Sequence, residues 1–238
     1  MAPDPVLEVV VTSAEEAVTA VAGGADRLEV ATDLHADGMT PALAEFRRVR
    51  ASVDVPLRVM LRDHGGFRAA APERLRDTAA ALRAAGADAF VLGFLTPGWA
   101  LDLPAMTAVL SAVPGCRWTF HRAMDHAADR AAVRRALHAL PGLDTILTAG
   151  SVTGVADGLD VLLSEPAAPA PAVSVMAGGG LLPGHLPALR AHGIRAFHLG
   201  TAVRHGGWNT PIDPAAVRHW RGLLDGATTH REPYTHAG

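Results

Sequence analysis

Short apolar runs alternate with stretches of helical period along almost the whole chain. The apolar runs are rich in Val, Leu, Ile and Phe without strict alternation, which is typical of parallel strands buried on both faces. We predict strands over residues 7–11, 27–30, 57–61, 89–94, 117–120, 145–148, 172–176 and 196–199. Between them we predict helices over residues 14–23, 41–52, 72–85, 103–112, 128–139, 153–164, 184–192 and 214–225.

Eight strand–helix units in 238 residues amount to about 30 residues per unit, which is typical of an α/β fold of the (β/α)8 TIM barrel type. An open, doubly wound sheet is the competing fold, but it usually has fewer units in this length. Gly24, Gly86, Gly142 and Gly193 each end a predicted helix shortly before a strand, as left-handed helix caps do. We therefore predict a single barrel domain over residues 1–226 and a C-terminal tail over residues 227–238.

The composition excludes several kinds of chemistry. All 21 basic residues are arginine, so the chain has no Schiff-base lysine and no P-loop lysine. Its single cysteine, Cys116, excludes an intrachain disulfide and a thiolate-rich metal cluster. The net charge of −3 argues against a nucleic-acid partner. We also expect no membrane contact and a cytoplasmic location, because no signal peptide or membrane-spanning run is evident.

Polar side chains interrupt the predicted strands near their C-terminal ends, where barrel enzymes place their active sites. Charged groups inside a barrel are costly unless paired, and isolated stabilising pairs have no reason to gather at one end. The candidate catalytic residues are Glu8, Glu29, Arg62, His121, Arg122 and His198. The structural alternative is an ion network in which the two acids pair with Arg62 and Arg122. His121 is either a general acid or base, or a neutral histidine bonded to Glu8 or Glu29.

Glycine-containing segments follow the seventh and eighth predicted strands. Backbone N–H groups in such loops can approach an anion closely, and many barrels bind phosphate at these two loops. The candidate anion-binding residues are Gly178, Gly179, Gly180, Gly200 and Thr201. Tight strand–helix turns are the structural alternative. The twelve histidines show no HxH or HExxH spacing, so no metal ligands can be assigned.

The order of several motifs resembles that of the CutC family of copper homeostasis proteins. The likeness runs from Leu7 to about Thr201 and includes ADRLE over 25–29, GMTP over 38–41 and TFHRAMD over 119–125. The resemblance implies a barrel fold, a role in copper homeostasis and a copper ion as partner. Members of the family have a cysteine soon after the second strand, where this chain has Ala31 and Thr32. The thiols that would bind copper are therefore missing here.

Three functions remain open from the sequence. The resemblance implies a cytoplasmic protein that binds or handles copper. The polar barrel mouth instead favours an acid–base enzyme (an isomerase, epimerase or lyase) that acts on a small anionic or phosphorylated metabolite. An inactive barrel that serves as an interaction module is the third. Trp208 and Trp220 are expected to be exposed, which is consistent with a homodimer.

Overall fold

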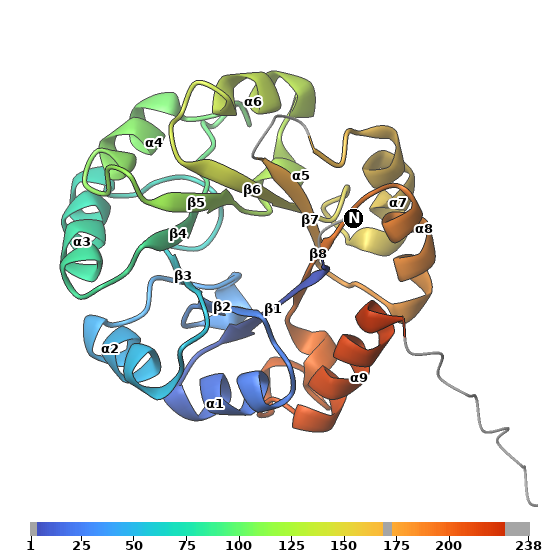
Figure 1. The fold of residues 1–238 in the computed structure, drawn as a ribbon. Coiled ribbons are helices and arrows are strands. Elements are labelled where there is room, and N and C mark those ends of the chain that lie inside the picture. Colours follow the sequence, from blue (N-terminus) through green and yellow to red (C-terminus); the bar gives the residue numbers. More distant parts are fainter. Residues whose placement is uncertain (1–3, 169–172, 227–238) are drawn as a thin grey trace, which may run out of the picture.

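The computed structural model describes residues 4–168 and 173–226, in which eight parallel strands close into a barrel (Figure 1). Neighbouring strands follow chain order, and β8 pairs with β1 to close the sheet. The predicted TIM barrel is confirmed. The strands are β1 (Val6–Val11), β2 (Arg27–Val30), β3 (Leu57–Met60), β4 (Ala89–Leu92), β5 (Arg117–Phe120), β6 (Leu143–Thr148), β7 (Ser174–Gly178) and β8 (Ala196–Leu199).

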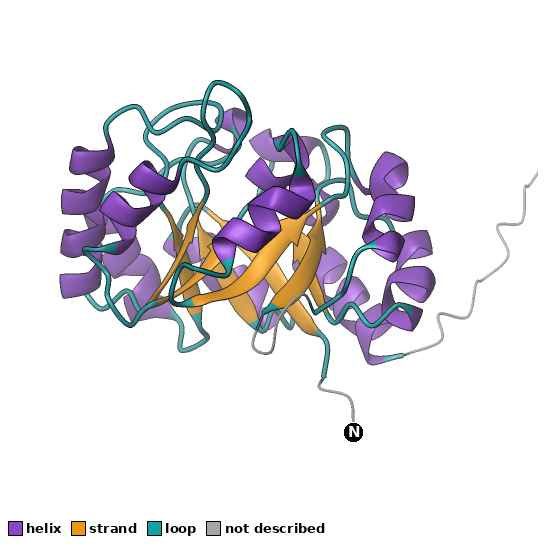
Figure 2. Ribbon diagram, turned by 90° about the horizontal axis from the view of Figure 1, so that it is seen from above, coloured by secondary structure: helices purple, strands orange, loops and turns teal. Residues whose placement is uncertain are grey.

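Helices surround the strands, and the longer loops gather at one end of the barrel (Figure 2). Ser13, Asp102, Asp129 and Asp213 cap helices by accepting a hydrogen bond from a first-turn N–H. The α-helices are α1 (Ala14–Ala22), α2 (Leu43–Ser52), α3 (Pro72–Ala84), α4 (Leu103–Leu110), α5 (Ala123–His126), α6 (Arg130–Leu137), α7 (Val155–Ser164), α8 (Leu186–Ala191) and α9 (Pro214–Asp225). Short 3-10 helices are η1 (Leu34–Ala36), η2 (Pro183–His185), η3 (Thr201–Val203) and η4 (Gly207–Asn209).

The strand β1 shows how polar groups come to lie inside the barrel. Leu7, Val9 and Val11 are fully buried in the large core between strands and helices. Because successive side chains of a strand point to opposite faces, Glu8 and Val10 face the barrel interior. The interior is therefore partly polar, and that polar layer leads directly to the carboxyl ends of the strands.

Most predicted elements are confirmed within two residues, and the deviations have physical causes. The predicted strand 89–94 is too long, because Phe94 and Leu95 are buried in the loop that follows β4. The strand predicted over 172–176 begins at Ser174 and extends to Gly178, while residue 172 lies outside the described residues. The helix α5 was not predicted, because its single turn follows β5 with almost no spacer.

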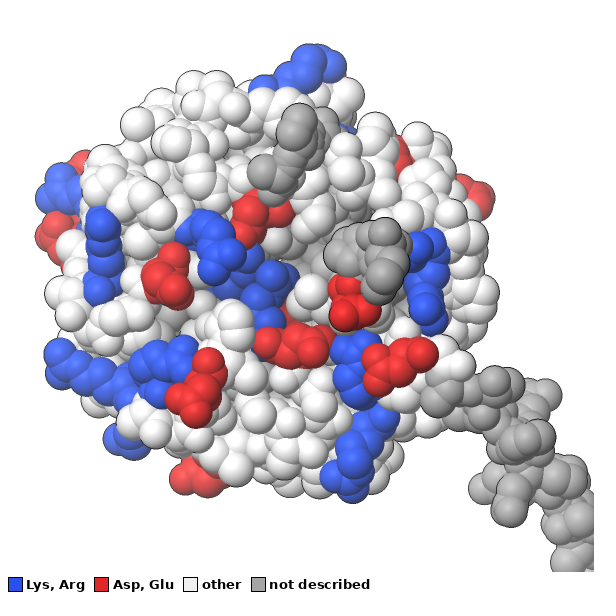
Figure 3. All heavy atoms as spheres, in the orientation of Figure 1, with Lys and Arg blue, Asp and Glu red and all other residues white. Residues whose placement is uncertain are grey.

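The end of the barrel where the strands begin is a charged, stabilising face. Figure 3 shows this face, on which arginine and acidic side chains interleave. Ion pairs near these strand ends include Arg58–Asp144 and Arg221–Asp26, each at 2.7 Å. Cys116 directly precedes β5 and so lies at this end. The predicted left-handed glycine caps are confirmed at Gly24, Gly86 and Gly193, which directly follow the C-cap residues of α1, α3 and α8 and have φ of 100–101°. The predicted cap is wrong at Gly142: its φ is 88°, but α6 ends at Leu137, so this glycine serves the turn before β6.

The expected exposure of the two C-terminal tryptophans is wrong. Trp220 is only 4% exposed, because α9 turns this side chain into the core, and Trp208 is half-buried at the barrel mouth. They therefore give no support to a homodimer. No helix in the described ranges 4–168 and 173–226 has the length and apolar character needed to cross a membrane. The predicted tail, 227–238, lies outside the described residues.

Candidate functional site

A cavity of about 450 Å³ opens at the end of the barrel where the strands terminate. Most of the predicted site residues line it: Glu29, Arg62, His121, Arg122, Gly179, Gly180, His198, Gly200 and Thr201. Glu8 lies behind this lining, in contact with His198. Gly178 is outside the lining, and a Cβ there would lie 2.8 Å from His198 Cβ, so this glycine allows β7 to pack closely against β8. Its contact with an anion stays a prediction.

Glu8 is held as a carboxylate by two partners. Its Oε2 accepts from Arg27 Nε at 2.5 Å, and its Oε1 is 2.9 Å from His198 Nδ1. Burial by itself would raise the pKa of Glu8, but these two partners outweigh it and bring that pKa well below its ordinary value. Conversely, burial would lower the pKa of His198, but the bond to Glu8 and the charge of Glu29 raise it. The contact with Glu8 therefore favours the imidazolium form of His198.

The predicted partners of the acids are wrong for Glu8, which pairs with Arg27 instead of Arg62 or Arg122. Arg27 was not among the candidates. Its position was a usable signal, since it precedes Glu29 by two residues on β2 and such residues share one face of a strand.

Glu29 combines burial with an unsatisfied oxygen. The residue is 4% exposed, and its Oε2 has no hydrogen-bond partner among the described residues. Burial raises the pKa of Glu29 to about 7, the charge of Glu8 adds to this effect, and His198 opposes it. At neutral pH, this cavity-lining carboxyl is therefore divided between its protonated and ionised forms.

Arg62 and His121 form a second buried pair. Arg62 Nη2 lies 2.8 Å from His121 Nε2, and Nη1 donates to the Asp37 carbonyl at 2.8 Å. A guanidinium can only donate, so His121 Nε2 accepts and the proton of the neutral ring sits on Nδ1. This assignment makes the 3.2 Å approach of the Ala123 amide to Nδ1 a close contact and not a hydrogen bond.

Burial and the charge of Arg62 hold the pKa of His121 well below its ordinary value. His121 is therefore neutral, as one sequence interpretation expected, but its partner is Arg62 and neither Glu8 nor Glu29. Its Nε2 lone pair is committed to the guanidinium. In this arrangement His121 positions Arg62.

Arg122 contributes to the cavity lining and is held by α5 and the loop after β6. Its Nε donates to Asp125 Oδ2 at 2.9 Å, and its Nη2 donates to the carbonyls of Ser151 and Val152 at 3.2 and 3.0 Å. A Cβ at Gly179 would lie 2.8 Å from Arg122 Cζ, so the guanidinium packs directly on the β7 loop. The predicted pairing of Arg122 with Glu8 or Glu29 is wrong, because Asp125 takes that place.

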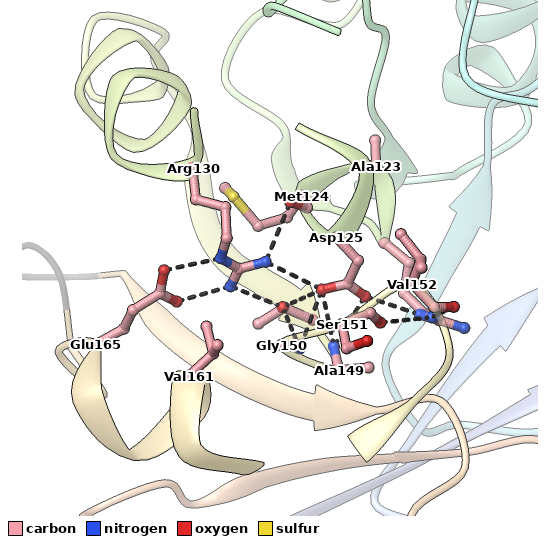
Figure 4. Close-up of polar contacts among 12 residues, drawn as sticks. Ala123, Met124, Asp125, Arg130, Ala149, Gly150, Ser151, Val152, Val161 and Glu165 are labelled. Carbon is pink, nitrogen blue, oxygen red and sulfur yellow. Dashed lines mark hydrogen bonds and ion pairs between the residues drawn. The ribbon is translucent and has the colours of Figure 1, made fainter. Parts of the chain in front are cut away.

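Asp125 connects three segments at the rim. Its buried carboxylate accepts from Thr148 Oγ1 at 2.5 Å and from the Ala149 and Gly150 amides at 2.9 and 3.1 Å. Arg130 Nη1 donates to it at 3.1 Å and extends the network to Glu165 (Figure 4). Asp125 was not predicted as a site residue. The signal was its spacing, three residues after Arg122 on one helical turn.

Part of the cavity lining is apolar. Leu34, Met60, Phe67, Leu199 and Trp208 contribute to it. Trp208 stacks so closely on Gly200 that a Cβ there would lie 2.3 Å from Trp208 Cη2. A lining that combines apolar and charged side chains suits a small molecule that has an apolar body and a charged end.

Two loops offer backbone donors at the same cavity. The amides of Gly180 and Leu181 after β7, and of Thr201 and Ala202 after β8, donate no hydrogen bond to any described group. All four residues line the cavity. Amides that lack protein acceptors are the donors that barrels use to bind anions at this position.

The sequence profile of the CutC family matches residues 5–203. The chain belongs to the CutC family. A CutC family protein of Xanthomonas campestris pv. campestris is 35% identical over 196 residues, which cover 81% of each chain. The human copper homeostasis protein cutC homolog is 33% identical over 196 residues, covering 81% of this chain and 71% of the human one. The structure of a CutC protein from Streptococcus agalactiae superposes with a TM-score of 0.75 at 22% identity, covering 83% of this chain and 98% of that one, a likeness of fold.

The cavity of this CutC protein does not fit a Cu(I) ion. Cu(I) is held by thiolate and thioether sulfur. The one cysteine of the chain, Cys116, lies at the opposite end of the barrel. Met60 is the methionine of the cavity lining, and one thioether without a second soft ligand makes no Cu(I) site. The ligands that do converge are oxygens and nitrogens, from Glu8, Glu29 and His198.

Proposed function

We propose that this CutC protein serves copper homeostasis, the role for which its relatives are named, through acid–base chemistry on a small anionic or phosphorylated molecule at the barrel mouth. The observation that carries the proposal is Glu29, a cavity-lining carboxyl with a free oxygen and a pKa of about 7. A group that titrates near neutral pH can both accept and donate a proton during a reaction. An isomerase, epimerase or lyase reaction fits, because the cavity lining contains no lysine or cysteine nucleophile.

His198 supplies a second group of different character. The 2.9 Å contact of its Nδ1 with Glu8 favours the protonated ring, which suits His198 to the role of the acid beside Glu29 as the base. Enzymes that use acid–base chemistry usually have two titrating groups whose surroundings shift their pKa values in ways that suit one as the acid and the other as the base. In this proposal Glu29 removes a proton from the substrate and His198 stabilises the negative charge that develops.

The charged end of the substrate is bound by arginine and by backbone amides. Arg62 is 3% exposed and its Nε lacks a partner in the described part of the chain, so it has donor capacity left. The amides of Gly180, Leu181, Thr201 and Ala202 supply further donors. We place this chemistry in the cytoplasm, which suits a chain with a single cysteine.

Direct binding of a copper ion is the second candidate, favoured by the names of the relatives. It requires ligands other than the missing thiols. Direct copper binding is tested by letting wild type and Cys116→Ala each compete with a chelator for Cu(I). Submicromolar Cu(I) binding that survives in Cys116→Ala would favour this candidate, whereas weak binding lost with the cysteine would exclude the mouth as a Cu(I) site.

The proposed function is tested first by binding. Small organic anions and phosphate esters are screened for an increase in the melting temperature of chelator-treated wild type. We expect at least one such anion to stabilise wild type and to lose its effect in Arg62→Met. His205→Gln, a change at an exposed histidine, is the matched control and should respond as wild type does. If no anion stabilises wild type, anion binding at the mouth is excluded.

The second test follows the proton. Each stabilising anion is incubated with protein in D2O, and incorporation of deuterium at carbon is followed by proton NMR. We expect incorporation with wild type and its loss in Glu29→Gln, which still binds the anion because the amide keeps the shape of the side chain. Unchanged incorporation in Glu29→Gln would contradict the role of Glu29.

A further inference from the structure

Three side chains from neighbouring strands converge under the cavity. Glu8 is on β1, Glu29 on β2 and His198 on β8, and these strands lie side by side (Figure 1). Each residue offers one oxygen or nitrogen atom, and these atoms all lie within 4.8 Å of one another. Two ligands of a metal ion lie about 3–4 Å apart when each is about 2.1 Å from the ion. Small side-chain movements would therefore bring all three into one coordination sphere.

An unsatisfied oxygen points to what this cluster lacks. Glu8 uses both of its oxygens, one on Arg27 and one on His198, but Glu29 Oε2 has no partner within the described chain although the residue is 4% exposed. A buried polar atom without a partner is uncommon in a folded protein and calls for a ligand or an ion. The second carboxylate of the cluster therefore has coordinating capacity that the protein itself leaves unused.

The cluster can balance the charge of a divalent cation. Carboxylates coordinate a metal when ionised and imidazole when neutral. In that state Glu8 and Glu29 supply two negative charges, which equals the charge of the cation. The charge added by the metal is thus balanced without any new acidic residue.

The neighbouring arginines restrict which cation can bind. Arg27 contacts Glu8, and the charges of Arg58 and Arg62 also act on the two carboxylates. Their repulsion must be overcome by strong coordination bonds. Carboxylate oxygens together with an imidazole nitrogen suit Zn²⁺, Co²⁺ or Cu²⁺, whereas Ca²⁺ and Mg²⁺ prefer sites made of oxygen alone.

We propose that Glu8, Glu29 and His198 form a binding site for a divalent transition-metal cation at the floor of the cavity. The site shares Glu29 and His198 with the proposed proton transfer but does not depend on it. The cation and the transferred protons occupy the same lone pairs, so the two states exclude each other. Binding of the cation therefore blocks proton transfer at the mouth.

The proposal is tested by titrating Zn²⁺ into the chelator-treated full chain by isothermal calorimetry at pH 7. We expect one ion per chain and, from buffers of different ionisation enthalpy, a net release of protons on binding, because the ligands must be deprotonated to coordinate the ion. Glu29→Gln and His198→Gln should each weaken Zn²⁺ binding at least about tenfold, since even the loss of an outer-sphere partner costs that much. Circular dichroism without metal shows whether each variant is folded. If His198→Gln does not fold, the Zn²⁺ affinity of Glu29→Gln alone decides the outcome.

Two control variants address other zinc-binding groups. His205 and Asp213 form an exposed histidine–carboxylate pair at 2.6 Å, and Cys116 is the one thiol. His205→Gln and Cys116→Ser should bind Zn²⁺ as wild type does. Absence of stoichiometric binding, or wild-type affinity in Glu29→Gln, would overturn the proposed metal site. Anion binding is measured in the presence of chelator, so either proposal can fail while the other stands.

Discussion

At the scale of single residues, Glu29 is where stability and chemistry oppose each other. A carboxyl with this burial and no partner for one oxygen would be replaced by an apolar or amide side chain if stability alone mattered. Its retention of a proton up to about pH 7 is the property on which the proposed function rests. The same property makes the stability of the protein depend on pH.

Glu29→Gln is expected to stabilise the protein at pH 8 and to leave it nearly unchanged at pH 4.5. The folded-state pKa of Glu29 is about 7, above the ordinary 4.5 of the unfolded chain. The stability of wild type is therefore fully present below pH 4.5 and declines as pH rises through 7, by on the order of 3 kcal/mol. Urea unfolding of wild type and variant at both pH values measures this difference.

The control for this prediction is Glu73→Gln, the same chemical change at a side chain that is 69% exposed. Its effect on the free energy of unfolding should be small and nearly independent of pH. A difference between wild type and Glu29→Gln that does not grow from pH 4.5 to pH 8 would contradict the raised pKa.

At the scale of elements, α7 approaches the loop that follows β6 so closely that only glycine fits at the contact. A Cβ at Gly158 would lie 2.1 Å from the Ala149 carbonyl oxygen, and one at Gly150 would lie 2.2 Å from the Gly158 carbonyl oxygen. These are backbone atoms, which cannot rotate away. The contact presses the loop after β6 toward Asp125, whose carboxylate binds the Ala149 and Gly150 amides and also holds Arg122.

Gly158→Ala is expected to destabilise the protein by about 1–3 kcal/mol. Alanine is the better helix former by about 1 kcal/mol, so a loss of stability can come only from the contact with the loop after β6. The displaced loop should also weaken anion binding, because it carries the carbonyls that hold Arg122. Thermal unfolding and anion titration measure the two effects. Gly184→Ala, at a glycine with open space around it, is the matched control and should change neither.

The elements themselves could be predicted well from the sequence, because buried parallel strands consist of short apolar runs. Boundaries failed where apolar residues are buried outside a strand, as Phe94 and Leu95 are in the loop after β4. The single-turn helix α5 has too few residues to show a period. The hydrophobic pattern of a sequence indicates which residues are buried. It cannot tell a strand from a loop that folds over the core, because both contain buried apolar residues.

At the scale of the whole molecule, the barrel closes at a seam between its first and last units. Across this seam, Arg204 Nη1 donates to Glu16 Oε1 at 2.5 Å and Nη2 donates to Oε2 at 2.8 Å. The side chain of Arg204 is 2% exposed, and Glu16 also accepts from the Thr12 amide at 2.8 Å. This two-point pair joins the start of the chain to the segment after β8.

Glu16→Gln is expected to lower the free energy of unfolding by about 3 kcal/mol at pH 7, because it leaves the buried Arg204 charge without its partner. Burial alone would raise the pKa of Glu16, but the bond to Arg204 outweighs it and lowers that pKa. Wild type therefore loses this contribution as pH falls below the ordinary value of 4.5, and the two proteins should become alike in acid.

Urea unfolding at pH 7 and pH 3 measures this effect. Glu45→Gln is the matched control, since it breaks an ion pair with Arg48 whose side chain is 66% exposed. Exposed pairs contribute about 0–1 kcal/mol, so the control should unfold nearly as wild type does. An equally small effect of Glu16→Gln at pH 7 would contradict a stabilising seam.

The site could be predicted from the sequence as a location but not as a set of contacts. Polar residues at strand ends indicated the barrel mouth correctly, because the topology of a parallel barrel brings those ends together. The pairing could not follow from that, since Glu8 and His198 are 190 positions apart and the register of β1 against β8 makes them neighbours. Arg27 was missed because its partner, Glu8, lies on another strand. Asp125 was missed although its spacing from Arg122 was a signal, because its contacts with the Ala149 and Gly150 amides come from a distant loop.

The contact between Glu8 and His198 also has a consequence for the time at which the protein becomes competent. Glu8 is synthesised 190 residues before His198. A growing chain that ends before His198 cannot hold the cluster under the cavity, however many of the other strands have already paired. The groups of the proposed metal and proton-transfer site therefore come together only once β8 has been made and pairs with β1.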